Sequence, residues 1–159
     1  MSLLDRDKIK ITKKIYFLQV IEMEFRRNGE IVFAILKKDE DVFKGIEEIA
    51  RKENIRGGTI LTGIGMLKEF TIGYWNGQKY EELFVEKNHE LVGFHGSISS
   101  TDPILHIHAA LAGPDHRIIG GHLISGKVDP LLELTIIDSG TEFKRIFNQK
   151  TNLKELSVL

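Results

Sequence analysis

The chain has 159 residues, of which 42% are hydrophobic and 28% charged, and its formal net charge is −1. These values are typical of one soluble domain with a genuine core, and the balanced charge argues against a protein whose main task is binding nucleic acid through its phosphates. Cysteine is absent, which excludes disulfides and thiolate metal sites. No stretch is long and apolar enough to cross a membrane, and we expect a cytoplasmic protein.

The first part of the chain predicts an extension followed by a β-hairpin. Residues 1–22 are assigned to an N-terminal extension for two reasons. The first fourteen residues are polar and basic, and Met23 begins a segment that is suitable as the start of the domain. Strands are expected at 16–25 and 31–36, with a turn at Arg26–Gly29 between them. The main domain is placed at 23–147.

One helix is predicted after the second strand. Asp41 supplies an N-cap, and Val42, Ile46, Ile49 and Ala50 follow at helical spacing. Charged residues occupy the opposite face. We expect a helix over about 41–53 whose apolar side packs on a sheet.

The remainder of the chain is rich in β-branched residues and glycine turns. An Asn-Gly pair at 76–77 favours a tight hairpin, because both central positions of that turn adopt positive φ. The fold class is therefore α+β: a single domain with a mostly antiparallel β-sheet and one main helix packed on it. Residues 148–159 are expected to be a C-terminal tail or a short docking helix. The predicted strands are 59–64, 70–75, 80–85, 91–99, 104–111, 118–123, 131–137 and an edge strand at 143–147.

Two of these strands, 104–111 and 131–137, are apolar on both faces. A strand in a one-layered domain normally exposes polar residues on one face. We therefore expect a second covering layer, and a homo-oligomer would supply it.

The segment 105–123, LHIHAALAGPDHRIIGGHL, contains four of the six histidines. His106 and His108 are two apart, so on a strand they project from the same face. The turn at 113–115 can fold the following run back on the first, which would bring His122 to them. Three imidazoles with open coordination positions predict a ligand-accepting metal site, and zinc is the expected ion. Gly120 and Gly121 allow close backbone approach beside it.

Other readings of these histidines and of their polar neighbours stay open. Histidine pairs on strands are also found solvated or hydrogen-bonded in cores. Glu90 is a candidate general base, or a partner that orients a ligand ring, or a solvated charge. Glu133 lies in the apolar strand 131–137 and either bonds a ligand histidine or faces solvent. His95 could line the same pocket, although a surface position is the simpler expectation.

Several motifs in the same order resemble the PPC domain (plant and prokaryote conserved). The resemblance covers about residues 24–143 and is carried by six segments: 36–42, 62–65, 72–74, 90–96, 104–115 and 119–123.

The resemblance implies an α+β, sandwich-like subunit of a trimer, in a cytoplasmic prokaryotic member that consists of the domain alone. In plants this domain follows AT-hook motifs in nuclear DNA-binding regulators, which is why prokaryotic members are often called DNA-binding proteins. No Arg-Gly-Arg-Pro hook is present here. The plant segment Gly-Arg-Phe-Glu-Ile-Leu corresponds to 87–92, where Asn88 and His89 replace its Arg and Phe and only Glu90 is kept.

The fold is also similar to that of acetolactate decarboxylase, a zinc enzyme whose metal is held by three histidines, two of them in a His-x-His pair. By that similarity His106, His108 and His122 would be the metal ligands. A shared fold does not establish a shared reaction.

Three functional hypotheses follow. The first is a metal-dependent protein that binds a small oxygen-bearing molecule, with lyase or hydrolase chemistry open to it. The second is a DNA-associated regulator, which would need a basic surface from the clusters at Lys8–Lys14, Arg26–Arg27 and Lys144–Arg145. The third is a trimeric scaffold or ligand sensor whose metal is structural.

Overall fold

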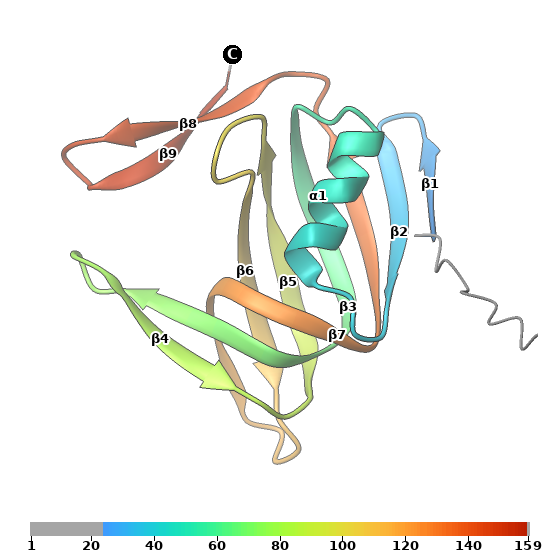
Figure 1. Ribbon diagram of the computed structural model, residues 1–159, viewed down its shortest axis with the longest axis vertical. Coiled ribbons are helices and arrows are strands. Elements are labelled where there is room, and N and C mark those ends of the chain that lie inside the picture. The colour runs from blue at the N-terminus through green and yellow to red at the C-terminus, as the bar shows by residue number, and fades with distance from the viewer. Residues whose placement is uncertain (1–23, 159) are drawn as a thin grey trace, which may run out of the picture.

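The structure is a computed structural model and describes residues 24–158, which excludes the expected N-terminal extension and most of the expected first strand. Within this range every strand pairing is antiparallel, and a single helix lies against the sheet (Figure 1). The predicted α+β class is confirmed. The elements are β1 (Glu24–Asn28), β2 (Ile31–Lys37), α1 (Val42–Lys52), β3 (Gly57–Trp75), β4 (Tyr80–Val85), β5 (His89–Ser99), β6 (Leu105–Ala112), β7 (Ile118–Asp138), β8 (Phe143–Asn148) and β9 (Leu153–Val158).

Two strands are far longer than predicted. β3 has 19 residues and β7 has 21, and each joins two segments that the sequence analysis had separated. Their mutual pairing shifts register at several bulges, and Gly65 and Glu69 adopt positive φ within β3. Bulges bend a strand without ending it, so the polar and glycine-rich interruptions in these segments are bends rather than loops.

The bending closes part of the sheet on itself. β3 pairs with β5, β5 with β6, β6 with β7, and β7 returns to pair with β3. β7 therefore contacts β6 through its first residues and β3 along much of its length. This closure brings segments that are distant in sequence to the region around the histidines.

Helix α1 begins and packs as predicted. The Asp41 carboxylate accepts a hydrogen bond from the Lys44 backbone N–H at 3.0 Å, which caps the helix. Its apolar stripe is buried in the same core as Leu36 of β2 and Leu132 of β7, on the face of the sheet that Figure 1 shows toward the viewer. In the described part of the chain, no helix covers the opposite face of these strands.

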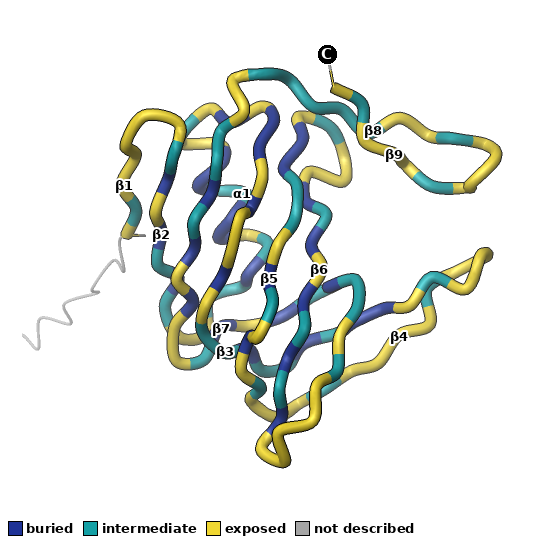
Figure 2. The backbone as a smooth tube through the Cα atoms, turned by 180° about the vertical axis from the view of Figure 1, so that it is seen from behind, coloured by how far each residue is buried: buried dark blue, intermediate teal, exposed yellow. Residues whose placement is uncertain are grey.

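The C-terminal residues form a strand, not the expected tail or docking helix. β9 pairs with β8 in a two-stranded sheet that projects from the main sheet and is largely exposed (Figure 2). Asn148 accepts a backbone hydrogen bond from Lys150, and Asn152 adopts a positive φ of 58°. These are turn features, and they place the expected domain boundary after residue 147 inside a hairpin.

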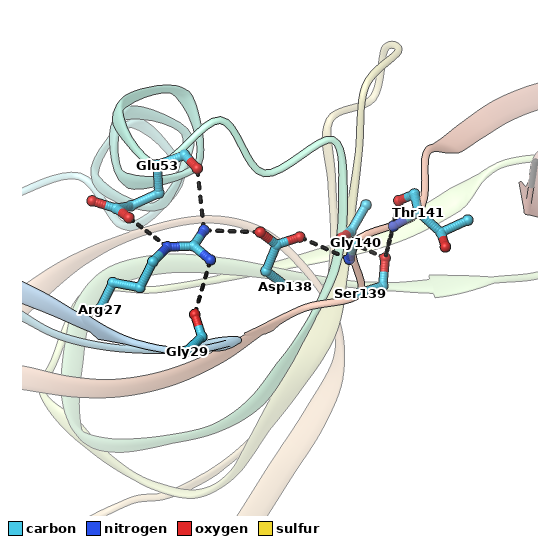
Figure 3. Close-up of polar contacts among 8 residues, drawn as sticks. Arg27, Gly29, Glu53, Asp138, Ser139, Gly140 and Thr141 are labelled. Carbon is cyan, nitrogen blue, oxygen red and sulfur yellow. Dashed lines mark hydrogen bonds and ion pairs between the residues drawn. The ribbon is translucent and has the colours of Figure 1, made fainter.

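Arg27 ties three elements together at the edge of the sheet (Figure 3). Its Nε donates to the Glu53 carboxylate at 2.7 Å, at the end of α1, and its Nη2 donates to Asp138 at 2.8 Å, at the end of β7. Its Nη1 also donates to the Gly29 carbonyl in the β1–β2 turn. This arginine is therefore committed to internal contacts.

Across residues 24–158, no helix is long and apolar enough to span a membrane.

Candidate metal centre

The alternation of β6 and its register with β7 bring the three histidines together. His106 and His108 lie on the same face of β6, and His122 of β7 is the direct cross-strand partner of His108. One ring nitrogen from each residue lies within 4.8 Å of those of the other two. The Nε2 atoms of His106 and His108 are 3.1 Å apart. The predicted convergence of these histidines is confirmed.

Gly120 and Gly121 allow this convergence, as expected. A Cβ at Gly120 would lie 2.6 Å from the Ala109 carbonyl oxygen of β6, and one at Gly121 would lie 2.7 Å from the Gly73 carbonyl oxygen of β3. Contacts this short are not tolerated between real atoms. Both glycines therefore let β7 approach its two neighbours immediately before His122.

The ring of His122 is held by an aromatic neighbour that the sequence analysis did not anticipate. Tyr80 of β4 stacks on it, with ring centroids 4.7 Å apart and an interplanar angle of 21°. The Nδ1 atom of His122 is buried and has no hydrogen-bond partner among residues 24–158. A buried ring nitrogen without a hydrogen-bond partner destabilises the folded state. Such a nitrogen is expected where the imidazole binds a ligand such as a metal ion.

Burial favours the neutral form of the three rings. The pKa of His106 falls from its ordinary value of 6.5 to about 4, mainly because the ring is partly buried and further because of His122 and the Arg145 guanidinium. Partial burial is also the main cause that lowers the pKa values of His108 and His122. Neutral imidazole is the form that binds a metal ion.

The donor set therefore fits a metal ion. Catalytic zinc sites have three ligands from the protein and leave further coordination positions for water or a ligand. Three neutral imidazole nitrogens on adjacent strands match such a set of protein ligands. Among residues 24–158, this is the group of metal-ligand side chains that lies close enough to hold one ion.

An open pocket of about 390 Å³ lies beside two of the histidines. His95 lies opposite His108 in the β5–β6 pairing, and it both lines this pocket and is exposed, so the two readings of His95 are compatible. The residues lining the pocket are Thr59, Ile60, Leu61, His95, Gly96, Ser97, His106 and His108.

The two candidate carboxylates lie away from the histidines. Glu90 is exposed and pairs with Ala112, four residues along β6 from His108, which corresponds to roughly 13 Å. Glu133 is exposed and lies on β7 between Ile35 and Ile64, where it lines a separate pocket of about 280 Å³.

Arg145 is the neighbour that sequence reasoning missed. It comes from β8, and its Nη2 donates to the Ser97 hydroxyl at 2.6 Å. Ser97 is the direct cross-strand partner of His106, so the guanidinium lies close enough to lower the pKa values of His106 and His122. No spacing signal marks this residue, because it reaches the site only through the packing of the β8–β9 hairpin.

The sequence also matches a known family over most of its length. The model of the Plants and Prokaryotes Conserved (PCC) domain matches residues 23–139. The chain belongs to this family. The resemblance identified from the motifs is thereby confirmed. No curated protein matches the sequence significantly.

Solved structures share the fold of this PCC domain. A "putative DNA-binding protein" from Bacteroides thetaiotaomicron has a TM-score of 0.79 at 22% identity, covering 85% of this chain and 96% of that one. A metal-containing protein from Archaeoglobus fulgidus has a TM-score of 0.74 at 28% identity, covering 85% and 97%. A plant- and prokaryote-conserved (PPC) protein from Pyrococcus horikoshii has a TM-score of 0.72 at 25% identity, covering 86% and 95%.

Proposed function

We propose that this PCC domain binds a divalent transition metal ion, zinc by preference, through His106, His108 and His122, and that the bound ion accepts a small oxygen-bearing ligand. The observation that carries the proposal is the meeting of three imidazoles, with one ring nitrogen of each within 4.8 Å of those of the other two. The metal-containing relative from Archaeoglobus fulgidus supports it. Zinc and imidazole nitrogen are a preferred pair.

The chain's own residues would each have a defined role. The three histidines would hold the ion, and the Tyr80 ring would fix the orientation of His122 by stacking. When bound, such an ion polarises a carbonyl or lowers the pKa of a coordinated water. Because Glu90 and Glu133 are distant, proton transfer by either of them is not part of the proposal, and the site is first a binding site.

We also propose a homotrimer, in the cytoplasm, as the form that carries this site. The face of the sheet away from α1 exposes large apolar side chains, which include Phe33, Ile64 and Leu131 with exposed fractions of 52%, 61% and 38%. Exposed apolar surface of this kind favours subunit contact. Replacing Ile64 with Glu is expected to convert the trimer to a folded monomer in light scattering, whereas Glu133→Gln on the same face leaves the trimer intact.

Binding of DNA is the second candidate, favoured by the description of the Bacteroides relative. The described basic residues give DNA binding limited support, because acidic residues already pair with them. Arg27 forms ion pairs with Glu53 and Asp138. The Lys144 Nζ lies 3.9 Å from a carboxylate oxygen of Glu142. The lysines at 8–14 lie outside the described residues. A duplex-binding assay over a salt series separates the candidates, because phosphate binding weakens steeply with salt.

Metal analysis of protein purified without chelators or tags tests the proposed function. The wild type is expected to carry about one zinc ion per chain, and the double variant His106→Ala/His108→Ala is expected to carry none. His116→Asn is the matched control, since His116 is exposed and adopts a positive φ of 62° that asparagine tolerates. A wild type that takes up no metal even after incubation with zinc contradicts the proposal.

A further inference from the structure

Arg145 carries a partly buried charge that no acidic group of residues 24–158 offsets. Among residues 24–158, no carboxylate lies within ion-pair distance of it, and its Nε is buried without a hydrogen-bond partner. The contact that it does make is with a neutral hydroxyl, that of Ser97. Arg27, by contrast, is bound by two carboxylates. A buried charge without a counter-charge is strongly unfavourable.

A metal ion at the neighbouring histidines would add to the uncompensated positive charge around Arg145. Ser97 lies directly opposite His106 on β6, and Cβ atoms of such pairs are about 4.5–5.5 Å apart. The guanidinium therefore lies beside His106, where a divalent cation held by the histidines would bring a second positive charge. Two cationic groups at this range repel each other. An anion that contacts both would offset both charges.

We propose that Arg145 and the metal ion together bind the carboxylate end of a small organic acid, with Arg145 as the residue that selects for negative charge. The inference rests on the proposed metal site. The ligand would reach the guanidinium through the pocket of about 390 Å³, whose lining includes His106 and Ser97, the residue that Arg145 contacts. That volume is at the lower end of the range for small-molecule sites.

The form of the site favours a carboxylate over a phosphate. The planar fork of a guanidinium matches the two oxygens of a carboxylate. Phosphate sites usually add backbone N–H donors from a glycine-rich loop or the start of a helix, and neither adjoins this pocket, which is bounded by strands. The pocket wall contributed by β3 includes Ile60 and Leu61, which suits the short carbon body of an organic acid.

Titration of zinc-loaded protein with glycolate and with its neutral counterpart glycolamide tests this assignment, and calorimetry measures both affinities. Arg145→Met keeps the length of the side chain and removes its charge, and is expected to weaken glycolate binding about tenfold or more. Arg145→Lys is expected to recover part of that loss. Glycolamide affinity is expected to be weak and equal in all three proteins. Arg117→Gln, an exposed arginine distant in the fold from Ser97, is the control and should bind glycolate as the wild type does.

A second readout separates recognition from structural support. Since Arg145 buries an unoffset charge, Arg145→Met is expected to keep its full zinc content and to unfold at the same or a higher temperature without ligand. Equal glycolate affinity in wild type and Arg145→Met, or no glycolate binding to zinc-loaded wild type, overturns the proposal and leaves the metal site standing. Inorganic phosphate that binds more tightly than glycolate, with the same dependence on Arg145, overturns the choice of carboxylate. A wild type without zinc overturns the proposed function as well.

Discussion

The two faces of β6 have opposite surroundings. On one face Leu105, Ile107 and Leu111 are buried in the core at exposed fractions of 4%, 0% and 0%. On the other face His106 is partly buried and His108 is exposed, and both meet His122. The alternation of a single strand thus separates the residues that hold the fold from those that offer ligand chemistry. Changes on the histidine face should alter binding with little effect on folding, and changes on the core face should do the reverse.

Removing a core side chain from β6 tests the core half of that comparison and has the largest expected effect. Ile107→Ala should lower the free energy of unfolding by about 2–5 kcal/mol, because it leaves a cavity in a close-packed region. Denaturant unfolding of metal-free protein measures it. His106→Asn, one position away, should change the same quantity far less. Equal losses in both variants would mean that the two faces are not independent.

Zinc should raise the free energy of unfolding by binding to the histidine face of β6. At a free concentration about 100-fold above its dissociation constant, an ion that binds only the folded state adds about 2.7 kcal/mol to the free energy of unfolding. Thermal unfolding with and without zinc measures this gain, and the double variant His106→Ala/His108→Ala should show none. A gain of similar size in the double variant would place the stabilising ion elsewhere.

The same face should make the metal-free protein sensitive to acid. Because the pKa of His106 is about 4 in the folded state and 6.5 ordinarily, the unfolded chain binds more protons between these values. The free energy of unfolding should therefore fall as the pH drops from about 6.5 to about 4, and His108 and His122 shift in the same direction. Urea unfolding of chelator-treated protein measures this, and His106→Asn should show a shallower fall. An identical fall in the variant would assign the effect to other groups.

Arg27 lies apart from β6 and should give the smallest effect. Arg27→Met removes its hydrogen bonds to Glu53 and Asp138, in a side chain that is 30% exposed. We expect a loss of about 1 kcal/mol in the free energy of unfolding and unchanged zinc content. Added salt should reduce the difference between the two proteins. A change in zinc content would show that this edge of the sheet influences the histidines.

Local patterns were sufficient for most of the secondary structure. The Asp41 cap and the apolar spacing of α1 predicted the helix, and the alternation of β6 predicted a strand with its histidines on one face. The length of β3 and β7 was not predictable in this way, because a bulge such as the one between Gly65 and Leu67 interrupts the strand pattern as a loop would. The strand β9 was missed for a related reason: its six residues are mostly exposed, so they carry little hydrophobic pattern.

The candidate site also contains some residues that were predictable from the sequence and others that were not. His106 and His108 are related by strand period, and a turn connects them to His122, so their meeting was predictable from spacing. Arg145 and Tyr80 were not, since one arrives from the β8–β9 hairpin and the other from β4. Glu133 was a candidate partner of a histidine because it is a carboxylate in an apolar strand, but it is exposed and lines a separate pocket.

The sequence by itself determined the family, the helix and the three histidines, because each depends on residues that are close in the chain or fixed by a two-residue period. Only the tertiary structure decided what surrounds the imidazoles. The register of β5 on β6 set Glu90 apart from them, and the length of β7 set Glu133 apart. The packing of β8 placed Arg145 beside them. Contacts of this kind depend on how bent strands close on one another. No local sequence pattern encodes which distant residues are brought together in this way.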